Sequence, residues 1–380
     1  MSLESHPLLV VGAGIGGLSA AIALRRAGFD AVVFERAPEL REVGAAISLW
    51  PNATRMLGKW GILDEVARRA HPVREAVARA ADGRLLHRMA LPETDAPSLL
   101  VHRADLHAAL AAALPPGTVR LGATFTRYAD AGGEVVAHFD GPGAVAGRAL
   151  VGADGLWSVV RAQLLGDGRP IYRGYPVWRG VARLEAGDAV PELCETLGAG
   201  RRFGIAPIGG GRVCWWATAN EPEGTDDAPE GRKAKLLRLF GRFHAPIPML
   251  LDRTPEEEML KNGTYDRPPV RGWGRGLVTL LGDAAHPTTP NFGQGGCLAV
   301  EDAAVLAAAL GYAPEVASAL RAFEAARYRR TASITRQSLR YGWIGQWASP
   351  AAVRAREILY RLAPNAMTRR TLRQLFAFDV

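Results

Sequence analysis

The feature that most constrains the fold of this chain is a glycine-rich turn near its N-terminus, Gly12-Ala13-Gly14-Ile15-Gly16-Gly17. The turn follows the apolar run Leu8–Val11 and leads into apolar residues at helical spacing. In a strand–turn–helix unit, Gly12 permits the tight turn, Gly14 lets the backbone approach a pyrophosphate, and Gly17 lets the helix pack closely on the strand. The first amides of the helix then face the anion. The turn therefore predicts a dinucleotide-binding βαβ unit.

An acidic residue stands where such a unit needs one. The second apolar strand, Ala31–Phe34, ends at Glu35, whose carboxylate can accept hydrogen bonds from the ribose hydroxyls of an adenosine. A lone glycine-rich turn can also be no more than a tight connection between a strand and a helix. Because strand, helix and terminal acid occur together, nucleotide binding is the favoured interpretation.

The composition is that of a globular protein with room for two domains. The chain has 380 residues, of which 48% are hydrophobic and 22% are charged. No apolar run approaches the length of a membrane span and the N-terminus lacks a secretory pattern, so we expect a cytoplasmic protein without integral membrane association. Cys194, Cys214 and Cys297 are too scattered to form a metal cluster, so we expect reduced, mostly buried thiols and no metal.

The net charge of +8 raises the question of an acidic partner. Much of the excess lies near the C-terminus, where arginines alternate with apolar residues in helical patterns and form no compact basic block. Such a pattern usually marks solvated helix faces, and we expect no nucleic-acid partner because no recognised binding module accompanies the charge. A weak role at a membrane surface or toward acidic substrates stays open.

Two further motifs, each fed by an apolar run, follow later in the chain. They are Gly152-Ala153-Asp154-Gly155, with Ser158 and Arg161 after it, and Gly282-Asp283-Ala284-Ala285-His286-Pro287. Between them, short segments rich in Trp, Val and Tyr and separated by Gly and Pro predict an antiparallel sheet.

We therefore expect an α/β fold in which a Rossmann-like nucleotide domain of the glutathione-reductase type is interrupted by a mixed or antiparallel β-sheet substrate domain. The nucleotide domain would comprise residues 1–170 and 271–340, and the substrate domain residues 171–270. Residues 341–380 would form C-terminal helices.

The order of the three motifs carries a resemblance to a known family. Together with Arg103–Leu106 and with Pro290–Gly296 after the third motif, they resemble the single-component, class A FAD-dependent aromatic monooxygenases. That group includes p-hydroxybenzoate and salicylate hydroxylases, flavin-type urate hydroxylase and zeaxanthin-epoxidase-like enzymes. Local similarity to the last two is closest over Val43–Asn52 and Gly282–Asp302.

The resemblance implies a reaction and its cofactors. FAD would be bound tightly without a covalent link, and NADH or NADPH would reduce it as a transient co-substrate. A flavin C4a-hydroperoxide would then pass one oxygen atom from O2 to an aromatic or polycyclic small molecule, by hydroxylation or epoxidation. The alternatives are a urate hydroxylase-like enzyme, an FAD dehydrogenase or reductase without oxygen insertion, and a non-catalytic FAD-binding protein. Whether the chain is a monomer or a homodimer stays open.

The resemblance also assigns the cofactor residues. Glu35 would hold the adenosine ribose, Asp154 would serve both FAD and the nicotinamide nucleotide, and Asp283 would bind ribityl or phosphate oxygens. The full cofactor set is Gly12, Gly14, Ile15, Gly16, Gly17, Glu35, Arg36, Ala46, Arg103, Asp154, Gly155, Gly282, Asp283, Pro290, Gly293, Gly295 and Gly296.

Some of these residues have a plainer interpretation. Asp154 could simply cap the following helix and Asp283 the segment after its strand, while Arg161 could be a helix-surface arginine. The Gly293–Gly296 stretch precedes a helical pattern and would aim free amides and a positive dipole end at the flavin. Otherwise it is a flexible loop.

The substrate site is less marked in the sequence. The resemblance places its roof on the middle sheet, with Trp178 among the candidates, and its floor at Leu49 and the 290–292 segment. The residues expected to act on the substrate are Arg202, Asn291, Pro290, Cys214 and Trp216. Urate hydroxylase has Asp where this chain has Asn291 and Tyr where it has Cys214. Since a polar substrate needs such partners, we expect urate to be rejected.

Overall fold

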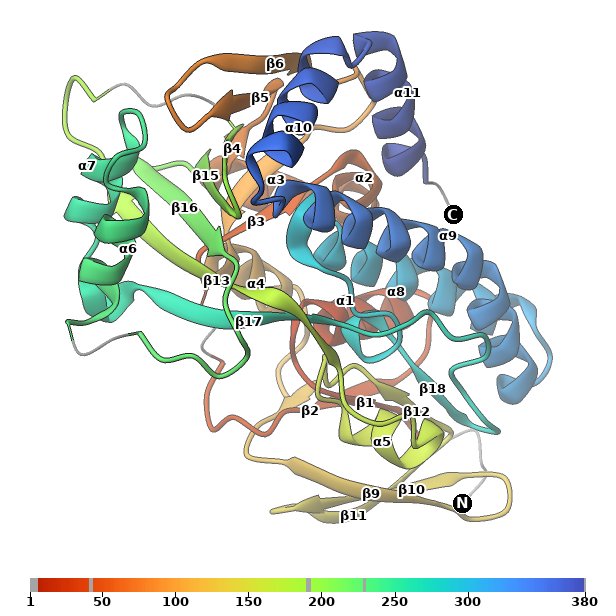
Figure 1. Ribbon diagram of the computed structural model, residues 1–380. Helices are drawn as coiled ribbons and strands as arrows, with labels where there is room; N and C mark the ends of the chain where they lie inside the picture. Colours follow the sequence, from red (N-terminus) through yellow and green to blue (C-terminus); the bar gives the residue numbers. More distant parts are fainter. Residues whose placement is uncertain (1–5, 41–43, 189–192, 228–229, 379–380) are drawn as a thin grey trace.

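The computed structural model describes residues 6–40, 44–188, 193–227 and 230–378. Val43, at the start of one stretch of resemblance, lies outside these residues. A parallel sheet with helices against it occupies one side of the molecule, and a larger sheet occupies the other (Figure 1). The long helix α9 (Val316–Gly345) runs along both parts and leads into two C-terminal helices, α10 (Pro350–Leu362) and α11 (Asn365–Phe376).

The nucleotide domain is built on a five-stranded parallel sheet of order β18-β12-β1-β2-β8. Its strands come from segments far apart in the sequence, so the expected split of this domain is seen in the sheet itself. The strands are β1 (Leu8–Val11), β2 (Ala31–Phe34), β8 (Val119–Arg120), β12 (Ala149–Gly152) and β18 (Val278–Leu280).

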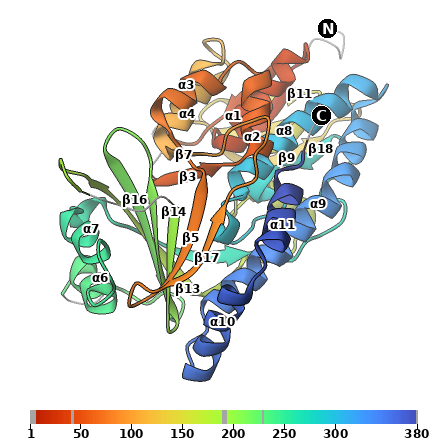
Figure 2. The same ribbon diagram turned by 90° about the horizontal axis from the view of Figure 1, so that it is seen from above.

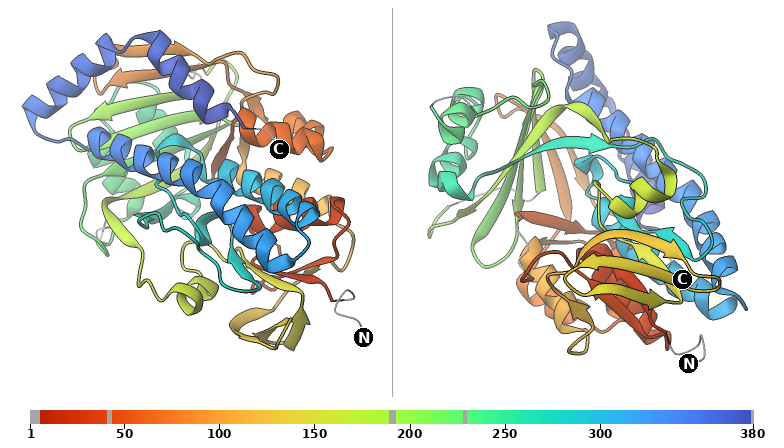
Figure 3. Two further views of the ribbon diagram at one scale, coloured as in Figure 1. Left: turned by 90° about the vertical axis from the view of Figure 1, so that its right-hand side faces the viewer. Right: turned by 90° about the horizontal axis from the view of Figure 1, so that it is seen from below.

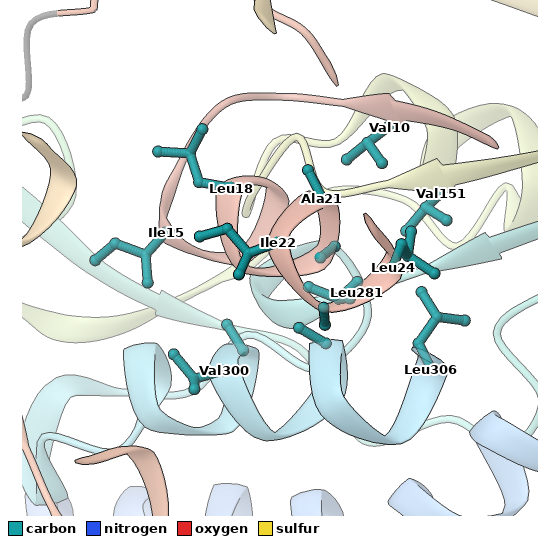
Figure 4. Close-up of a cluster of buried hydrophobic side chains, with 14 of the residues drawn as sticks. Val10, Ile15, Leu18, Ala21, Ile22, Leu24, Val151, Leu281, Val300 and Leu306 are labelled. Carbon is teal, nitrogen blue, oxygen red and sulfur yellow. The ribbon is translucent and has the colours of Figure 1, made fainter. Parts of the chain in front are cut away.

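Helix α1 (Ile15–Arg26) is buried between this sheet and helix α8 (Gly295–Tyr312). Figure 4 shows Leu18, Ala21 and Ile22 of α1 between the strands on one side and Val300 and Leu306 of α8 on the other. Helix α8 is long and apolar enough to cross a membrane by composition alone, but most of it is buried inside the protein. Its apolar character is therefore explained by core packing.

The substrate sheet has seven strands in the order β17-β13-β16-β15-β14-β5-β6. Five of them lie within the expected substrate domain, but β5 and β6 come from residues 75–90. The expected assignment of residues 1–170 to the nucleotide domain is corrected accordingly, because β5 pairs in parallel with β14 and extends the sheet. Figure 2 shows β5 beside β14 and helices α6 and α7 on the far side of the sheet. The strands are β5 (Glu75–Ala80), β6 (Leu85–Ala90), β13 (Ile171–Arg183), β14 (Leu193–Gly198), β15 (Arg201–Pro207), β16 (Arg212–Ala219) and β17 (Leu260–Asp266).

The remaining elements connect or cover these two sheets, and a small sheet β11-β10-β9 forms the opposite end of the molecule from α10 and α11 (Figures 1 and 3). The helices are α2 (Pro51–Lys59), α3 (Leu63–Arg69), α4 (Arg103–Ala112), α5 (Val159–Leu165), α6 (Arg232–Phe240) and α7 (Ile247–Arg253). The strands are β3 (Ala46–Leu49), β4 (His71–Pro72), β7 (Leu99–His102), β9 (Thr124–Asp130), β10 (Val135–Asp140) and β11 (Gly143–Gly147).

A buried ion cluster fixes α8 against α9 and the third motif. Asp302 Oδ2 accepts hydrogen bonds from the Gly282 amide at 2.9 Å and from His286 Nε2 at 2.6 Å, and its Oδ1 accepts from Arg327 Nε at 2.6 Å. Burial alone would raise the pKa of Asp302, but His286 and Arg327 outweigh it and lower that pKa to about 2. Asp302 is therefore an anion that three separate segments share.

We predict that Asp302→Asn lowers the free energy of unfolding by about 3 kcal/mol, because His286 and Arg327 lose the buried carboxylate that they share and only Glu301 still pairs with Arg327. The wild-type advantage should be complete above the ordinary carboxyl pKa of 3.8 and should disappear as the pH falls toward 2. Chemical denaturation at several pH values measures both effects. The control Asp30→Asn removes the exposed pair with Arg25 and should cost less than about 1 kcal/mol. Equal losses in the two variants would contradict the assignment.

Candidate active site

The glycine-rich turn has the geometry that a pyrophosphate site needs. Gly12 has φ of +98°, a conformation that favours glycine. A Cβ on Gly17 would lie 1.8 Å from the Gly12 carbonyl oxygen, so only glycine lets α1 approach β1 this closely. A Cβ on Gly14 would meet no atom within 4 Å, so the space beside this residue is open. The expected roles of these glycines are consistent with this geometry.

Glu35 lies at the end of β2 and faces the same turn. Its carboxylate accepts hydrogen bonds from the Ala13 amide at 2.8 Å and the Ala37 amide at 2.9 Å. A carboxylate has about four acceptor positions, so two remain for ribose hydroxyls. His107 of α4, which the sequence analysis did not single out, also holds the turn through a 2.7 Å contact between its Nε2 and the Ala13 carbonyl.

The second motif places its acid at the start of α5. Asp154 accepts hydrogen bonds from the Ser158 hydroxyl at 2.5 Å and from the Val159 and Val160 amides at 2.8 and 3.2 Å. These hydrogen bonds are those of a residue that caps the N-terminus of a helix, as the plainer interpretation expected. The role of Asp154 toward FAD and the nicotinamide nucleotide stays a prediction. Burial raises the pKa of Asp154, although these hydrogen bonds oppose the change. Gly155, at φ of +79°, makes the turn between strand and helix.

Arg161 is not a helix-surface arginine, and that interpretation is wrong. Its side chain is only 1% exposed, and its Nη1 donates to the carbonyls of Ala284 and Ala285 at 2.8 and 2.7 Å. Its Nε also binds Asp167. Arg161 therefore joins the second motif to the third, in a way that no local pattern around α5 reveals.

The third motif and the N-terminus of α8 face the same space. The Asp283 carboxylate lies 3.7 Å from where a Cβ on Gly295 would be. The side chain of Asp283 is accessible to solvent yet has protein on most sides, and this partial burial raises its pKa while His286 and Arg103 oppose the change. Among the residues that the structure describes, Gln294 at the N-cap position makes no side-chain hydrogen bond to the first amides of α8. They are therefore available to an anionic ligand.

The residues around this space fit a flavin. Within the described residues, Thr288 Oγ1 and Gln294 Nε2 are buried polar atoms without a hydrogen-bond partner, and both flank Gly295. Such atoms are costly unless a ligand or water satisfies them. Gly293, at φ of +59°, turns the chain just before α8. A cofactor with many hydrogen-bonding ring atoms suits this donor and acceptor set.

The other expected cofactor residues surround these motifs. Ala46 begins β3 and pairs with His102, which brings it beside Arg103 at the start of α4. Pro290 is exposed and opens a short helical turn that ends at Phe292. Arg36 is exposed after the end of β2.

Strand alternation divides the substrate sheet into two faces. Trp178 is fully buried with Phe203 and Trp215 in a core beside α6 and α7. Trp216 and Cys214 point to the other face, because side chains alternate along β16. The prediction that Trp178 belongs to the roof of the substrate site is thus wrong. The other predicted roof residues, Arg202, Cys214 and Trp216, share the face of the sheet that is turned away from α6 and α7.

The expected floor also needs one correction. Leu49 is fully buried in the core of the nucleotide domain. Phe292 remains at the site and packs against Tyr341 of α9 with ring centroids 5.2 Å apart.

A polar network on this face surrounds Arg202. Its guanidinium donates to Glu195 Oε1 at 3.0 Å, to Gln346 Oε1 at 3.0 Å and to Asn291 Oδ1 at 2.8 Å. Burial opposes the charge, but Glu195 outweighs it and raises the pKa of Arg202. Tyr341 donates its hydroxyl to Glu195 Oε2 at 2.9 Å. The expected pair Arg202 and Asn291 thus meets, but as part of a network whose other members the sequence did not indicate.

Asn291 is held from several sides. Its amide nitrogen donates to Thr289 Oγ1 at 2.8 Å and to the Ser338 carbonyl at 2.9 Å, and it lies 3.2 Å from the Tyr175 hydroxyl.

Arg179 on β13 is a further charged residue that the sequence analysis did not single out. Burial lowers the pKa of its guanidinium, and the positive charge of Arg103 adds to that effect. Arg179 and Arg103 are therefore close enough for their positive charges to interact.

Comparison with known proteins decides the family. The family described as FAD binding domain matches residues 5–338. Aurachin C monooxygenase/isomerase of Stigmatella aurantiaca is 41% identical over 373 residues, which cover 96% of this chain and 97% of that protein. The chain belongs to the class A FAD-dependent monooxygenases. The resemblance, the fold class and the FAD cofactor expected from the motifs are confirmed.

Two further relatives of this monooxygenase bear on its site. The 3-amino-4-hydroxybenzoate 2-monooxygenase of Streptomyces cremeus is 37% identical over 88% of this chain and 86% of its own length. The crystal structure of Klebsiella pneumoniae HpxO complexed with FAD and uric acid has a TM-score of 0.90 at 29% identity and covers 98% of this chain and 97% of that chain. The enzyme class is thus shown, and the substrate is left to the chemistry of the site.

For this monooxygenase we predict opposite outcomes for two glycine substitutions in one turn. Gly14→Ala should leave the unfolding temperature of the FAD-free protein unchanged but weaken FAD binding by about tenfold or more, because its methyl group enters the pyrophosphate space. Gly17→Ala should lower the stability itself by about 1–3 kcal/mol. Thermal unfolding with and without FAD, together with fluorescence titration of FAD, separates the two effects. Loss of stability in both variants would place the pyrophosphate elsewhere.

Proposed function

We propose that this monooxygenase hydroxylates or epoxidises an uncharged aromatic or polycyclic small molecule. One oxygen atom of O2 enters the product, and the other leaves as water with the hydride and proton supplied from NADH or NADPH and solvent. The observation behind this proposal is that the guanidinium of Arg202 is fully paired within the protein. The cation is already paired with Glu195 and hydrogen-bonded to two amides, so it offers no free positive charge to an anionic substrate.

The apolar residues on the same face support this substrate class. Cys214 is buried, and burial raises the pKa of its thiol to about 12, so it is a neutral apolar group and not a nucleophile. The indole of Trp216 packs flat against Gly204, where a Cβ would lie 1.8 Å from the ring. Phe292 and Tyr341, which pack against each other with ring centroids 5.2 Å apart, provide further aromatic surface near Arg202 and Asn291. An apolar wall with few polar groups selects its ligand by shape.

The protein residues position the reactants and stabilise charge. FAD, when bound, accepts a hydride from the nicotinamide nucleotide and activates O2. The amides at the start of α8 would stabilise negative charge that develops on the bound cofactor. Tyr341 stays protonated, because burial raises the pKa of its phenol well above the ordinary value and Glu195 adds to the effect. It therefore keeps its hydrogen bond to Glu195 and supplies no base.

The resemblance to HpxO, whose structure holds uric acid, keeps urate as the alternative substrate. We predict that urate does not stimulate NAD(P)H oxidation, because the polar partners that a buried urate needs are here used within the protein. Neutral hydroxylated, quinolone-like or polycyclic aromatics should stimulate oxidation and gain one oxygen atom. Oxygen consumption and mass spectrometry of the products measure this. Urate turnover comparable with that of the best aromatic compound would contradict the proposal, and nicotinamide oxidation without oxygen in the product would indicate a reductase.

Glu195 offers a sharper test of the same idea. Glu195→Gln removes the countercharge of Arg202, and we predict that it tightens binding of anionic aromatic ligands by about tenfold or more, because they then pair with an otherwise uncompensated cation. Binding of neutral aromatics should weaken or stay unchanged. Flavin-fluorescence titration with an aromatic carboxylate and its amide measures the difference. The control Tyr341→Phe removes a hydrogen bond from Glu195 but keeps the ion pair, and it should not shift the preference. A similar shift in both variants would contradict the prediction.

A further inference from the structure

The turn between α10 and α11 exposes large apolar side chains. Leu362 is 73% exposed and Met367 is 62% exposed, and one turn earlier in α10 Ile358 and Leu359 are each more than half exposed. This region lies at the outer edge of the molecule, far from the small β9–β11 sheet (Figures 1 and 3). We use the name C-terminal tip for these four residues and the exposed arginines around them, which are Arg354, Arg361, Arg369, Arg370 and Arg373.

The charge of the C-terminal tip is one-sided. Within the part of the chain that the structure describes, none of its five arginines forms a salt bridge. The one acid between residues 341 and 378 is Glu357, which pairs with Arg84 at 3.1 Å. The tip therefore combines exposed apolar side chains with uncompensated positive charge.

The exposed apolar side chains are not needed for packing of α10. Its inner face is already occupied by Arg356, which donates to the carbonyls of Gly345 and Gly198 at 2.6 and 2.8 Å, and by Tyr360, whose hydroxyl donates to that of Tyr341 at 2.8 Å. Ile358 and Leu362 are one helical turn apart and therefore share a face of α10 that these contacts leave open. A helix with this arrangement has an apolar outer stripe bordered by arginines.

We propose that the C-terminal tip is a docking surface for an anionic phospholipid membrane. Apolar side chains on such a helix enter the headgroup region, and each arginine near the surface adds attraction to anionic lipid. A second copy of the chain is the poorer occupant, because a two-fold contact would place the same arginines against one another. A nucleic acid would satisfy the arginines but leave the four apolar side chains in water.

Docking at the tip would bring the substrate site near the membrane. Helix α10 has the apolar stripe on its outer face and Tyr360 on its inner face. The hydroxyl of Tyr360 bonds Tyr341, which bonds Glu195, and Glu195 in turn pairs with Arg202. An apolar substrate dissolved in lipid would then be concentrated close to the residues of the proposed substrate site. The docking itself does not depend on the proposed reaction.

Flotation of the FAD-loaded enzyme with lipid vesicles tests the proposal without turnover. We expect the enzyme to float with vesicles of phosphatidylcholine and phosphatidylglycerol, much less with phosphatidylcholine alone, and less as salt concentration rises. Arg361→Glu with Arg370→Glu should reduce the partition coefficient for anionic vesicles by at least about tenfold. Leu362→Ser with Met367→Ser should reduce binding that persists at high salt.

A matched control carries the same change in net charge at the opposite end of the molecule. Arg127 on β9 and Arg275 before β18 are exposed there, and Arg127→Glu with Arg275→Glu should bind vesicles much as wild type does. Retained FAD in every variant shows that folding is intact. Absence of vesicle binding, or equal losses in tip and control variants, would overturn the proposal. So would a dimer that Leu362→Ser dissociates, or binding of single-stranded RNA that is stronger than vesicle binding.

Discussion

The carboxylate of Asp302 holds in place the helix whose N-terminus we expect to face the flavin. It belongs to α8, yet it holds the amide of Gly282 at the end of β18 and the guanidinium of Arg327 on α9. The N-terminus of α8 can aim its free amides at the cofactor only while α8 keeps this position against the sheet. A buried carboxylate without its partners costs several kcal/mol. Movement of one of the three segments away from the other two would impose that cost, so they keep a fixed relative position. The cost of leaving Asp302 unpaired therefore fixes the position of α8 relative to the end of β18 and to α9.

The three motifs form one connected unit because Arg161 extends this constraint. It spans from the α5 side of the second motif to the carbonyls of Ala284 and Ala285 in the third, and the first motif contacts the second where Gly12 packs on Ala153. A substitution that breaks one of these contacts should thus disturb the motifs on both sides of it. This coupling gives a physical reason for the motifs to occur together in one chain.

The sequence predicted the parts of the structure whose causes are local. The strand–turn–helix unit around Gly12 and the acid Glu35 follow from backbone conformation and spacing. The recruitment of β5 into the substrate sheet could not be predicted, because it depends on pairing with β14, more than a hundred residues later in the chain. Alternation shows from sequence that Trp215 and Trp216 face opposite ways. The packing of α6 and α7 against one side of the sheet is needed to show that Trp215 lies in the core and Trp216 lies on the side of the site.

Pairing within the protein is also the basis of the substrate selection that we propose. A buried arginine with no partner would attract any anion of suitable shape, but Arg202 is held by Glu195 and Asn291 before a substrate arrives. A ligand that competes for it must break these bonds and leave a carboxylate buried without its counterion, which costs several kcal/mol. Since Tyr360 of α10 supports the same network through Tyr341, the C-terminal helices would take part in the selection that we propose, in which an uncharged substrate leaves every one of these bonds intact.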